Sequence, residues 1–259
     1  MKYKPVSKEK IEEIYEKIKK LKREKLFLIE DIKTLEIAVD YKLKPLIILI
    51  TEKIAESFSS LLTSSDIIED KIFIISEKRI KKLKQVKANP GIIALFKKRD
   101  SKSIKPKKAE YYFALERIQD PGNVGTIIRS ALNFNVSKVL LSKGSASIYN
   151  PKVIRGSMGT VMIQSVKENL ELKEELLSLK EKGFKVYLTS SKIGKRIDSI
   201  NLEFPSIFVV GNESKGISQE IEETGDFWIK IPTTGKSDSL NVSVSASIIM
   251  YEIYKKNYK

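Results

Sequence analysis

The chain has 259 residues, 41% of them hydrophobic, which is enough for one large or two modest folded domains. It contains no cysteine and no histidine, which excludes disulfides, thiolate nucleophiles, serine–histidine triads and most zinc sites. A formal net charge of +15 favours polyanionic partners, nucleic acid first, although lysines on solvated helix faces would account for part of it.

No apolar run approaches the roughly 18 to 20 residues that a membrane helix needs. The N-terminus carries charged residues where a signal peptide would have its apolar segment. We therefore expect a cytoplasmic protein with no membrane partner.

The first hundred residues alternate between helical and strand patterns. Apolar residues at helical spacing predict an amphipathic helix with a basic outer face over residues 7–25. Asp31 is expected to cap a second helix. Short apolar runs predict strands over residues 26–30, 45–50, 71–76 and 91–96, with further helices near 52–62 and 78–86. The pattern indicates a small α/β unit.

Residues 97–110 are polar and basic and lack any apolar periodicity. This composition is typical of an interdomain linker, although so basic a segment could also follow a phosphate backbone. We therefore predict one domain over residues 1–105 and a second over 111–259.

The second domain also alternates strands and helices. Strands are expected over residues 111–116, 138–142, 161–166, 184–190, 206–211 and 227–231. Several of these runs are almost continuously apolar, which is typical of strands buried on both faces of a mainly parallel sheet. Open sheets of this kind bind ligands at the carboxyl ends of their strands, and three unusual polar loops fall there.

The first loop follows strand 111–116, where Asp120 precedes a Pro-Gly turn. Asn123 is expected near the start of the next helix, and Arg129 lies six residues further on. Six helical residues rotate by about 240°, so these two side chains should not share a helix face. Taken alone, Asn123 is better explained as an ordinary turn or cap residue and Arg129 as a surface charge.

The second loop, residues 211–218, has the glycine spacing of a phosphate-binding loop, but Ile217 stands where that motif needs lysine. This disfavours nucleotide hydrolysis. No two glycines are spaced G-x-G, which also disfavours conventional Rossmann cofactor binding. The third loop leads into a helix that begins near Asn241, and both Ser239 and Asn241 are residue types that cap a helix.

Three segments carry a family resemblance. LERIQDPGNVGTIIRSA, IFVVGNESKGIS and IPTTGKSDSLNVSVSASI, in this order, resemble the signature motifs of the SpoU (TrmH) family of S-adenosylmethionine-dependent RNA 2′-O-ribose methyltransferases. NPKVIRGSMGT resembles a further stretch of that family, and the similarity covers residues 111–254. The N-terminal unit is similar to the substrate-binding domain of ribosomal-RNA members, which is related in shape to some ribosomal proteins.

The resemblance implies an α/β fold with a C-terminal trefoil knot, a homodimer, and S-adenosylmethionine as the cofactor without any metal. It places the cofactor against the backbone of Thr189, Gly211, Ile231 and Leu240. It brings the side chains of Asn123, Arg129, Glu213, Ser239 and Asn241 to the reacting ribose.

Three positions depart from the family pattern, and the identity of the general base is open. Ser214 stands where the family usually has glycine, and Thr233 and Thr234 are also unusual. The family arginine proposed as the base corresponds to Arg129, but a guanidinium is a poor proton acceptor near neutrality. We prefer Arg129 as an electrostatic stabiliser that grips a phosphate, whereas Glu213 either accepts the proton or orients its neighbours.

We therefore expect methyl transfer to a ribose 2′-hydroxyl of RNA, with large-subunit (23S) ribosomal RNA as the substrate. The alternatives are a non-catalytic RNA-binding or ribosome-associated protein, a transfer-RNA methyltransferase, and a role in antibiotic resistance. Apolar positions of the last helix are compatible with a homodimer through the C-terminal domain, although all of them could pack within one subunit. These positions are Val242, Val244, Ile248, Ile249 and Ile253.

Overall fold

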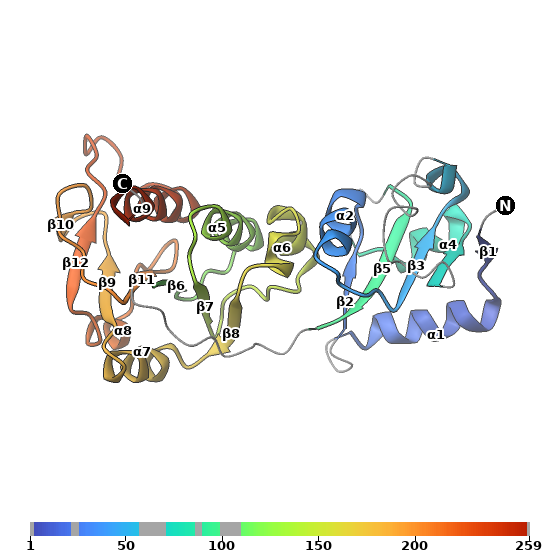
Figure 1. Cartoon of the computed structure of the whole chain (residues 1–259), viewed down its shortest axis with the longest axis horizontal. Helices are drawn as coiled ribbons and strands as arrows, with labels where there is room; N and C mark the ends of the chain where they lie inside the picture. The colour runs from blue at the N-terminus through green and yellow to red at the C-terminus, as the bar shows by residue number, and fades with distance from the viewer. Residues whose placement is uncertain (1–2, 22–25, 57–70, 86–89, 99–109, 258–259) are drawn as a thin grey trace. The chain divides into compact units, whose positions relative to one another are not determined.

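The computed structural model describes residues 3–21, 26–56, 71–85, 90–98 and 110–257 (Figure 1). The chain divides into two compact units, one formed by Met1–Asp100 with Tyr149–Met162, and the other by Ser101–Ile148 with Ile163–Lys259. The predicted domains place residues 149–162 in the second domain, whereas this segment packs with the first unit. Most of the predicted linker lies outside the described residues, and Lys97 belongs to a strand.

The first unit contains a five-stranded sheet. Its strands, in spatial order, are β1 (Lys4–Pro5), β4 (Ile72–Ile74), β3 (Ile47–Ile50), β5 (Ile92–Lys97) and β2 (Leu26–Ile29). The strand β5 runs antiparallel to both β3 and β2, and the other pairs are parallel. The four strands predicted here are confirmed. The short strand β1 was not predicted, because two residues are too few to form a pattern.

The N-terminal segment of the first unit contributes the helices α1 (Lys8–Lys19), α2 (Ile32–Asp40) and α4 (Glu77–Leu83). The predicted cap at Asp31 is confirmed, since its Oδ1 accepts the N–H of Thr34 at 2.8 Å. Apolar residues of α1 and α4 pack with the sheet in one core. Of the helix predicted near 52–62, residues 52–56 are helical and the remainder lies outside the described residues.

The segment 149–162 contributes the short helix α6 (Pro151–Gly156) to this first unit. The ring centres of Tyr149 and of Phe27 on β2 lie 5.3 Å apart. The strand predicted over 161–166 is wrong, because residues Thr160–Met162 form a 3-10 turn in which the N–H of Met162 donates to Gly159 at 2.9 Å. The strand in this part of the chain, β8, begins only at Val166.

The second unit contains a seven-stranded sheet in which every pair is parallel, as predicted. Its strands, in spatial order, are β10 (Lys195–Arg196), β12 (Phe227–Lys230), β9 (Lys185–Thr189), β11 (Ser206–Val210), β6 (Tyr111–Leu115), β7 (Lys138–Ser142) and β8 (Val166–Leu170). The central strands β6 and β11 are fully buried, which explains their continuous apolar sequences.

Helices cover both faces of this sheet (Figure 1). The helices α5 (Pro121–Asn133) and α9 (Val242–Asn257) lie side by side on one face, joined by a 2.7 Å hydrogen bond between the hydroxyls of Ser130 and Ser247. The helices α7 (Leu172–Glu181) and α8 (Gln219–Glu222) pack on the other face. This arrangement leaves the loops at the carboxyl ends of β6, β9, β11 and β12 free to carry polar residues.

Within the described residues, none of the helices combines the length and the apolar character needed to span a membrane. The trefoil knot that the family resemblance implies stays a prediction.

Candidate active site

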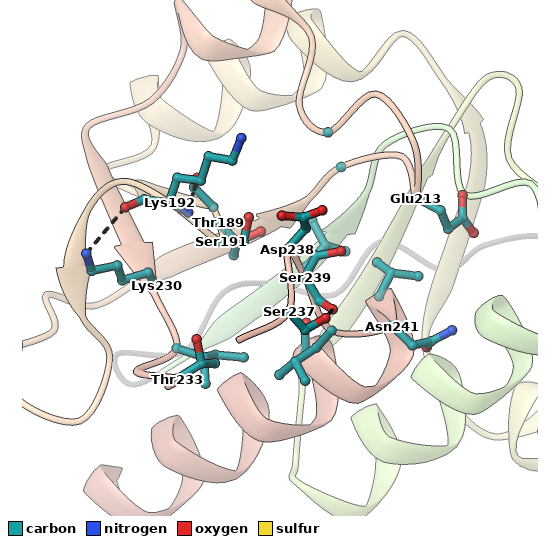
Figure 2. A pocket seen from close by; sticks show the side chains of 18 of the residues that line it. Thr189, Ser191, Lys192, Glu213, Lys230, Thr233, Ser237, Asp238, Ser239 and Asn241 are labelled. Carbon is teal, nitrogen blue, oxygen red and sulfur yellow. Dashed lines mark hydrogen bonds between the residues drawn. The ribbon is translucent and has the colours of Figure 1, made fainter. Parts of the chain in front are cut away.

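A cavity of about 770 Å³ lies at the carboxyl ends of three neighbouring strands of the second unit (Figure 2). Its walls are the loops that follow β9, β11 and β12, together with the start of α9. The volume lies within the range of roughly 300 to 1,000 Å³ that holds small molecules and cofactors. The three polar loops predicted from the sequence therefore contribute to one edge of the sheet, and two of them line this cavity.

All four residues assigned to a cofactor, Thr189, Gly211, Ile231 and Leu240, line this cavity. Gly211 allows two backbone segments to approach closely. A Cβ atom at this position would lie 2.2 Å from the carbonyl carbon of Gly216, closer than real Cβ atoms come to any backbone atom. Only glycine fits here without a shift of the loop.

Three polar side chains from distant parts of the chain form a hydrogen-bonded network beside the cavity. The Nδ2 of Asn123 donates to Oε1 of Glu213 at 3.0 Å, and the Nδ2 of Asn241 donates to Oδ1 of Asn123 at 3.1 Å. The amide of Asn123 is thereby held from both ends. The structure brings together these three predicted site residues, and Glu213 and Asn241 also line the cavity.

The start of α9 fixes Asn241 in this network. Its Oδ1 accepts the N–H of Ser243 at 2.8 Å and the hydroxyl of Ser243 at 2.7 Å, which is the geometry of a helix cap. Ser239, the other predicted capping residue, makes no such bond to any residue that the structure describes. It lines the cavity, and its carbonyl accepts the hydroxyl of Ser237 at 3.3 Å.

Arg129 is placed differently from the other predicted residues. Asn123 lies in the first turn of α5, and Arg129 follows six residues later on a different face of the helix, with an exposed side chain. Among the residues that the structure describes, the Arg129 guanidinium forms no hydrogen bond or ion pair with Glu213 or Asn241, and it does not line the cavity. The arginine is therefore free to meet a ligand that arrives from solvent.

Asn212 is a structural residue of the site that the sequence reasoning missed. Its Nδ2 donates to the carbonyl of Arg117 at 2.8 Å and to Oε2 of Glu213 at 3.3 Å. Its Oδ1 accepts the N–H groups of Ser214 and Lys215 at 3.0 and 3.1 Å. An asparagine directly after a strand is a signal for such a turn.

This turn also explains the departure at Ser214. The left-handed backbone conformation falls on Gly216, with φ +71°, and the backbones of Asn212 and Gly216 exchange two hydrogen bonds of 2.9 Å. Ser214 has no positive φ, so the turn does not require glycine there.

Two lysines lie at the end of the cavity opposite Glu213 and Asn241 (Figure 2). The Nζ of Lys230 donates to the carbonyl of Lys192 at 3.3 Å. Both lysines line the cavity, as do Thr233 and Thr234. None of these four residues was assigned to the site from the sequence. Their position at or shortly after the carboxyl ends of β9 and β12 was the available signal.

No group of three or more Asp, Glu, His or Cys side chains that could hold a metal ion occurs among the residues that the structure describes.

Residues 110–251, more than half of the chain, match the model of the SpoU rRNA Methylase family. The chain belongs to this family. An uncharacterized tRNA/rRNA methyltransferase of Borreliella burgdorferi is 35% identical over 155 residues, which cover 60% of this chain and 68% of the relative. The 23S rRNA (guanosine(2553)-2′-O)-methyltransferase RlmP of Bacillus subtilis is 34% identical over 140 residues, or 54% of this chain and 56% of the relative.

Solved structures of SpoU-type proteins share the fold. A structure described as an RNA 2′-O ribose methyltransferase covers 100% of both chains at 26% identity and a TM-score of 0.81. An AdoMet-bound rRNA methyltransferase from Sinorhizobium meliloti also covers 100% of both chains, at 22% identity and a TM-score of 0.81. The α/β fold with its mostly parallel sheet is thus that of SpoU methyltransferases, and this chain is an RNA methyltransferase of that family.

Proposed function

We propose that this SpoU protein transfers a methyl group from S-adenosylmethionine to the 2′-hydroxyl of a ribose in RNA, and that its substrate is large-subunit ribosomal RNA. The observation that carries the proposal is the network of Asn123, Glu213 and Asn241 beside a cavity of cofactor size. The RNA 2′-O ribose methyltransferase and RlmP, both named above, support the reaction class.

The residues around the cavity fit S-adenosylmethionine. Thr189, Gly211, Ile231 and Leu240, which line the cavity, would hold it largely through main-chain groups. The cavity is lined by carboxylates as well as lysines, which suits a ligand that carries both signs of charge. When bound, S-adenosylmethionine supplies a methyl group on a positively charged sulfur.

The network would orient the ribose that accepts this methyl group. Holding two reactants in line can contribute about 7 to 11 kcal/mol to a reaction. Because both Glu213 oxygens already accept hydrogen bonds from Asn123 and Asn212, we assign Glu213 a positioning role. Arg129 would grip a phosphate of the RNA and stabilise negative charge on the attacking oxygen.

Methyl transfer tests this proposal directly. The protein is incubated in chelator with radiolabelled S-adenosylmethionine and either unmodified ribosomal RNA or unmodified transfer RNA, and the labelled ribose is then mapped. We expect cofactor binding by calorimetry without RNA or metal, and one labelled 2′-O-methyl group in the large-subunit RNA. If the label appeared only in transfer RNA, the proposal that ribosomal RNA is the substrate would be wrong. Cofactor binding without methyl transfer to either RNA would favour a non-catalytic protein.

A homodimer through the second unit is part of this proposal. Val244 and Tyr251 of α9 are 46% and 49% exposed, and Tyr251 packs edge-on against Phe134, the residue that follows α5, with ring centres 5.9 Å apart. Two of the positions considered from the sequence, Ile249 and Ile253, are buried within the subunit and are not available to a partner. The exposed apolar side chains remain on the face formed by α5 and α9.

Sedimentation at micromolar concentration is expected to give twice the mass of the chain. The charged variant Tyr251→Glu should shift the protein towards monomer, because a carboxylate would lose its hydration in an apolar interface. A monomeric mass for the wild-type protein would reject the dimer.

We further propose that the first unit binds the RNA backbone. Lys78, Lys81 and Lys82 of α4 are exposed, and Glu77 is the only acidic residue of this helix. Replacing all three lysines by glutamine should weaken RNA binding and its salt dependence, since fewer counterions are released. The matched control replaces Lys10, Lys17 and Lys19 of α1, which pair with Glu13 or Glu16. If both triple variants lost the same amount of RNA affinity, α4 would not be a specific contact for the RNA backbone.

A further inference from the structure

A second cavity of about 380 Å³ lies beside the candidate active site. It is bounded by residues that follow β6, including Arg117 and Gln119, and by residues 212–218 after β11. Residues 212–216 also line the larger cavity, so one loop separates the two. A ligand in the second cavity would therefore lie one loop away from the Asn123–Glu213–Asn241 network.

The free charges of the second cavity are positive. Arg117 and Lys215 are both exposed. The one carboxylate in its lining, Glu116, is 3% exposed and accepts the N–H of Ser218 at 3.0 Å and its hydroxyl at 2.5 Å. Both Glu116 oxygens are thus directed to Ser218.

Arg117 is only weakly engaged by the protein. Its nearest acidic partner, Glu220, lies 4.0 Å away, and both side chains are more than half exposed. Such exposed pairs contribute roughly 0 to 1 kcal/mol, so an incoming anion can displace Glu220. Lys215 forms no ion pair within the described part of the chain.

The backbone of Arg117 is held in an uncommon conformation. Its φ of +52° lies in the left-handed region, which non-glycine residues rarely adopt. The N–H of Arg117 donates to the hydroxyl of Ser142 at 2.8 Å, and its carbonyl accepts the Nδ2 of Asn212 at 2.8 Å. Residues at the carboxyl ends of β6, β7 and β11 therefore fix the backbone position of Arg117. Backbone strain held in this way is typical of functional positions.

We propose that the second cavity binds the phosphate and base of a nucleotide next to the methylated one in the substrate RNA. Arg117 and Lys215 would contact the phosphate, and the Gln119 amide would hydrogen-bond to the base. A guanidinium matches phosphate oxygens in pairs, and a polar amide can read a base edge. The inference rests on the proposed function, because it takes RNA to be the molecule that crosses this edge of the sheet.

The first test removes the positive charges. Affinity for a transcript of large-subunit ribosomal RNA is measured at several salt concentrations for Arg117→Gln, Lys215→Gln and the double variant. We expect the double variant to bind the transcript roughly tenfold more weakly. The slope of the logarithm of the binding constant against the logarithm of the salt concentration should become shallower by about 0.7 for each lost phosphate contact to single-stranded RNA. Lys182→Gln, which removes an exposed charge at the amino end of β9, serves as the control. An unchanged affinity and slope in the double variant would overturn the proposal.

The second test uses the absence of cysteine from the chain. Gln119→Cys creates a single thiol at an exposed position of the second cavity, and Lys182→Cys creates one at the control site. The same transcript should slow maleimide alkylation of Gln119→Cys several-fold and leave Lys182→Cys unaffected. This protection should disappear when Arg117→Gln and Lys215→Gln are added.

The two proposals can fail separately. If the wild-type protein methylates the transcript while Gln119→Cys is alkylated equally fast with and without RNA, the second cavity is not an RNA site and the proposed reaction stands. If the transcript protects Gln119→Cys but receives no methyl group from the wild-type protein, the RNA site stands and the proposed reaction is wrong.

Discussion

Replacing Gly211 by alanine is expected to weaken S-adenosylmethionine binding by up to roughly a hundredfold. The added Cβ would lie 2.2 Å from the carbonyl carbon of Gly216 and 2.4 Å from the nitrogen of Ile217, and neither is the flexible end of a side chain. The loop after β11 must therefore move, and it carries Glu213. Overpacking of this kind costs about 1 to 3 kcal/mol, and 3 kcal/mol corresponds to a loss of affinity of roughly a hundredfold.

Calorimetry with S-adenosylmethionine measures this effect, and thermal unfolding shows whether the fold persists. Gly183→Ala is the matched control: Gly183 has a φ of +88°, and, apart from its chain neighbours, no atom of the described residues lies within 4 Å of the added Cβ. Gly183 also does not line the cavity. Gly183→Ala should lose some stability through backbone strain and still bind the cofactor. Near wild-type affinity in Gly211→Ala would show that the cofactor does not lie against this turn.

Arg129→Ala is expected to reduce methyl transfer by roughly two to three orders of magnitude, which is typical of losing one donor to a developing negative charge. Affinity for S-adenosylmethionine should change little, because the Arg129 side chain lies outside the cavity lining. Arg129→Lys should restore only a small part of the rate. An ammonium keeps the charge but lacks the planar fork that binds two oxygens together.

Single-turnover methylation of ribosomal RNA, with cofactor binding measured in parallel, tests these two variants. Lys182→Ala provides a control for the loss of one positive charge from the same unit. Normal turnover in Arg129→Ala would leave Arg129 as a surface charge and place the reaction elsewhere. Near-normal turnover in Arg129→Lys would mean that charge alone suffices.

The central strands could be predicted because burial on both faces leaves a continuous apolar run, as in β6 and β11. The strand β8 could not, because it lies at the edge of the sheet and none of its residues is fully buried. Val161 and Met162 are buried and resemble a strand in sequence, but they lie in a 3-10 turn. Hydrophobicity reports burial, and it does not by itself distinguish these backbone conformations.

The place of the candidate site could also be predicted, since polar loops that follow parallel strands meet at one edge of the sheet. The contacts within it could not be predicted from spacing. Asn123 and Glu213 are 90 residues apart, and only the family resemblance placed them together. The role of Asn212 depends on a turn that brings its side chain to the carbonyl of Arg117. For Arg129, the sequence correctly indicated a helix face different from that of Asn123, and its catalytic role stays a prediction.

The connections between distant segments have a consequence for synthesis of the protein. The strand β6 pairs with β11, whose residues emerge from the ribosome much later, and α5 is bonded to α9 across 117 residues. The strand β6 can pair early with β7, but its other edge stays unpaired until β11 has been synthesised, and native pairings this far apart in sequence form slowly. The third wall of the larger cavity is completed only by residues 230–242. A growing chain consequently cannot capture its cofactor to stabilise itself, and the ability to bind it arises only after β12 and the start of α9 have docked.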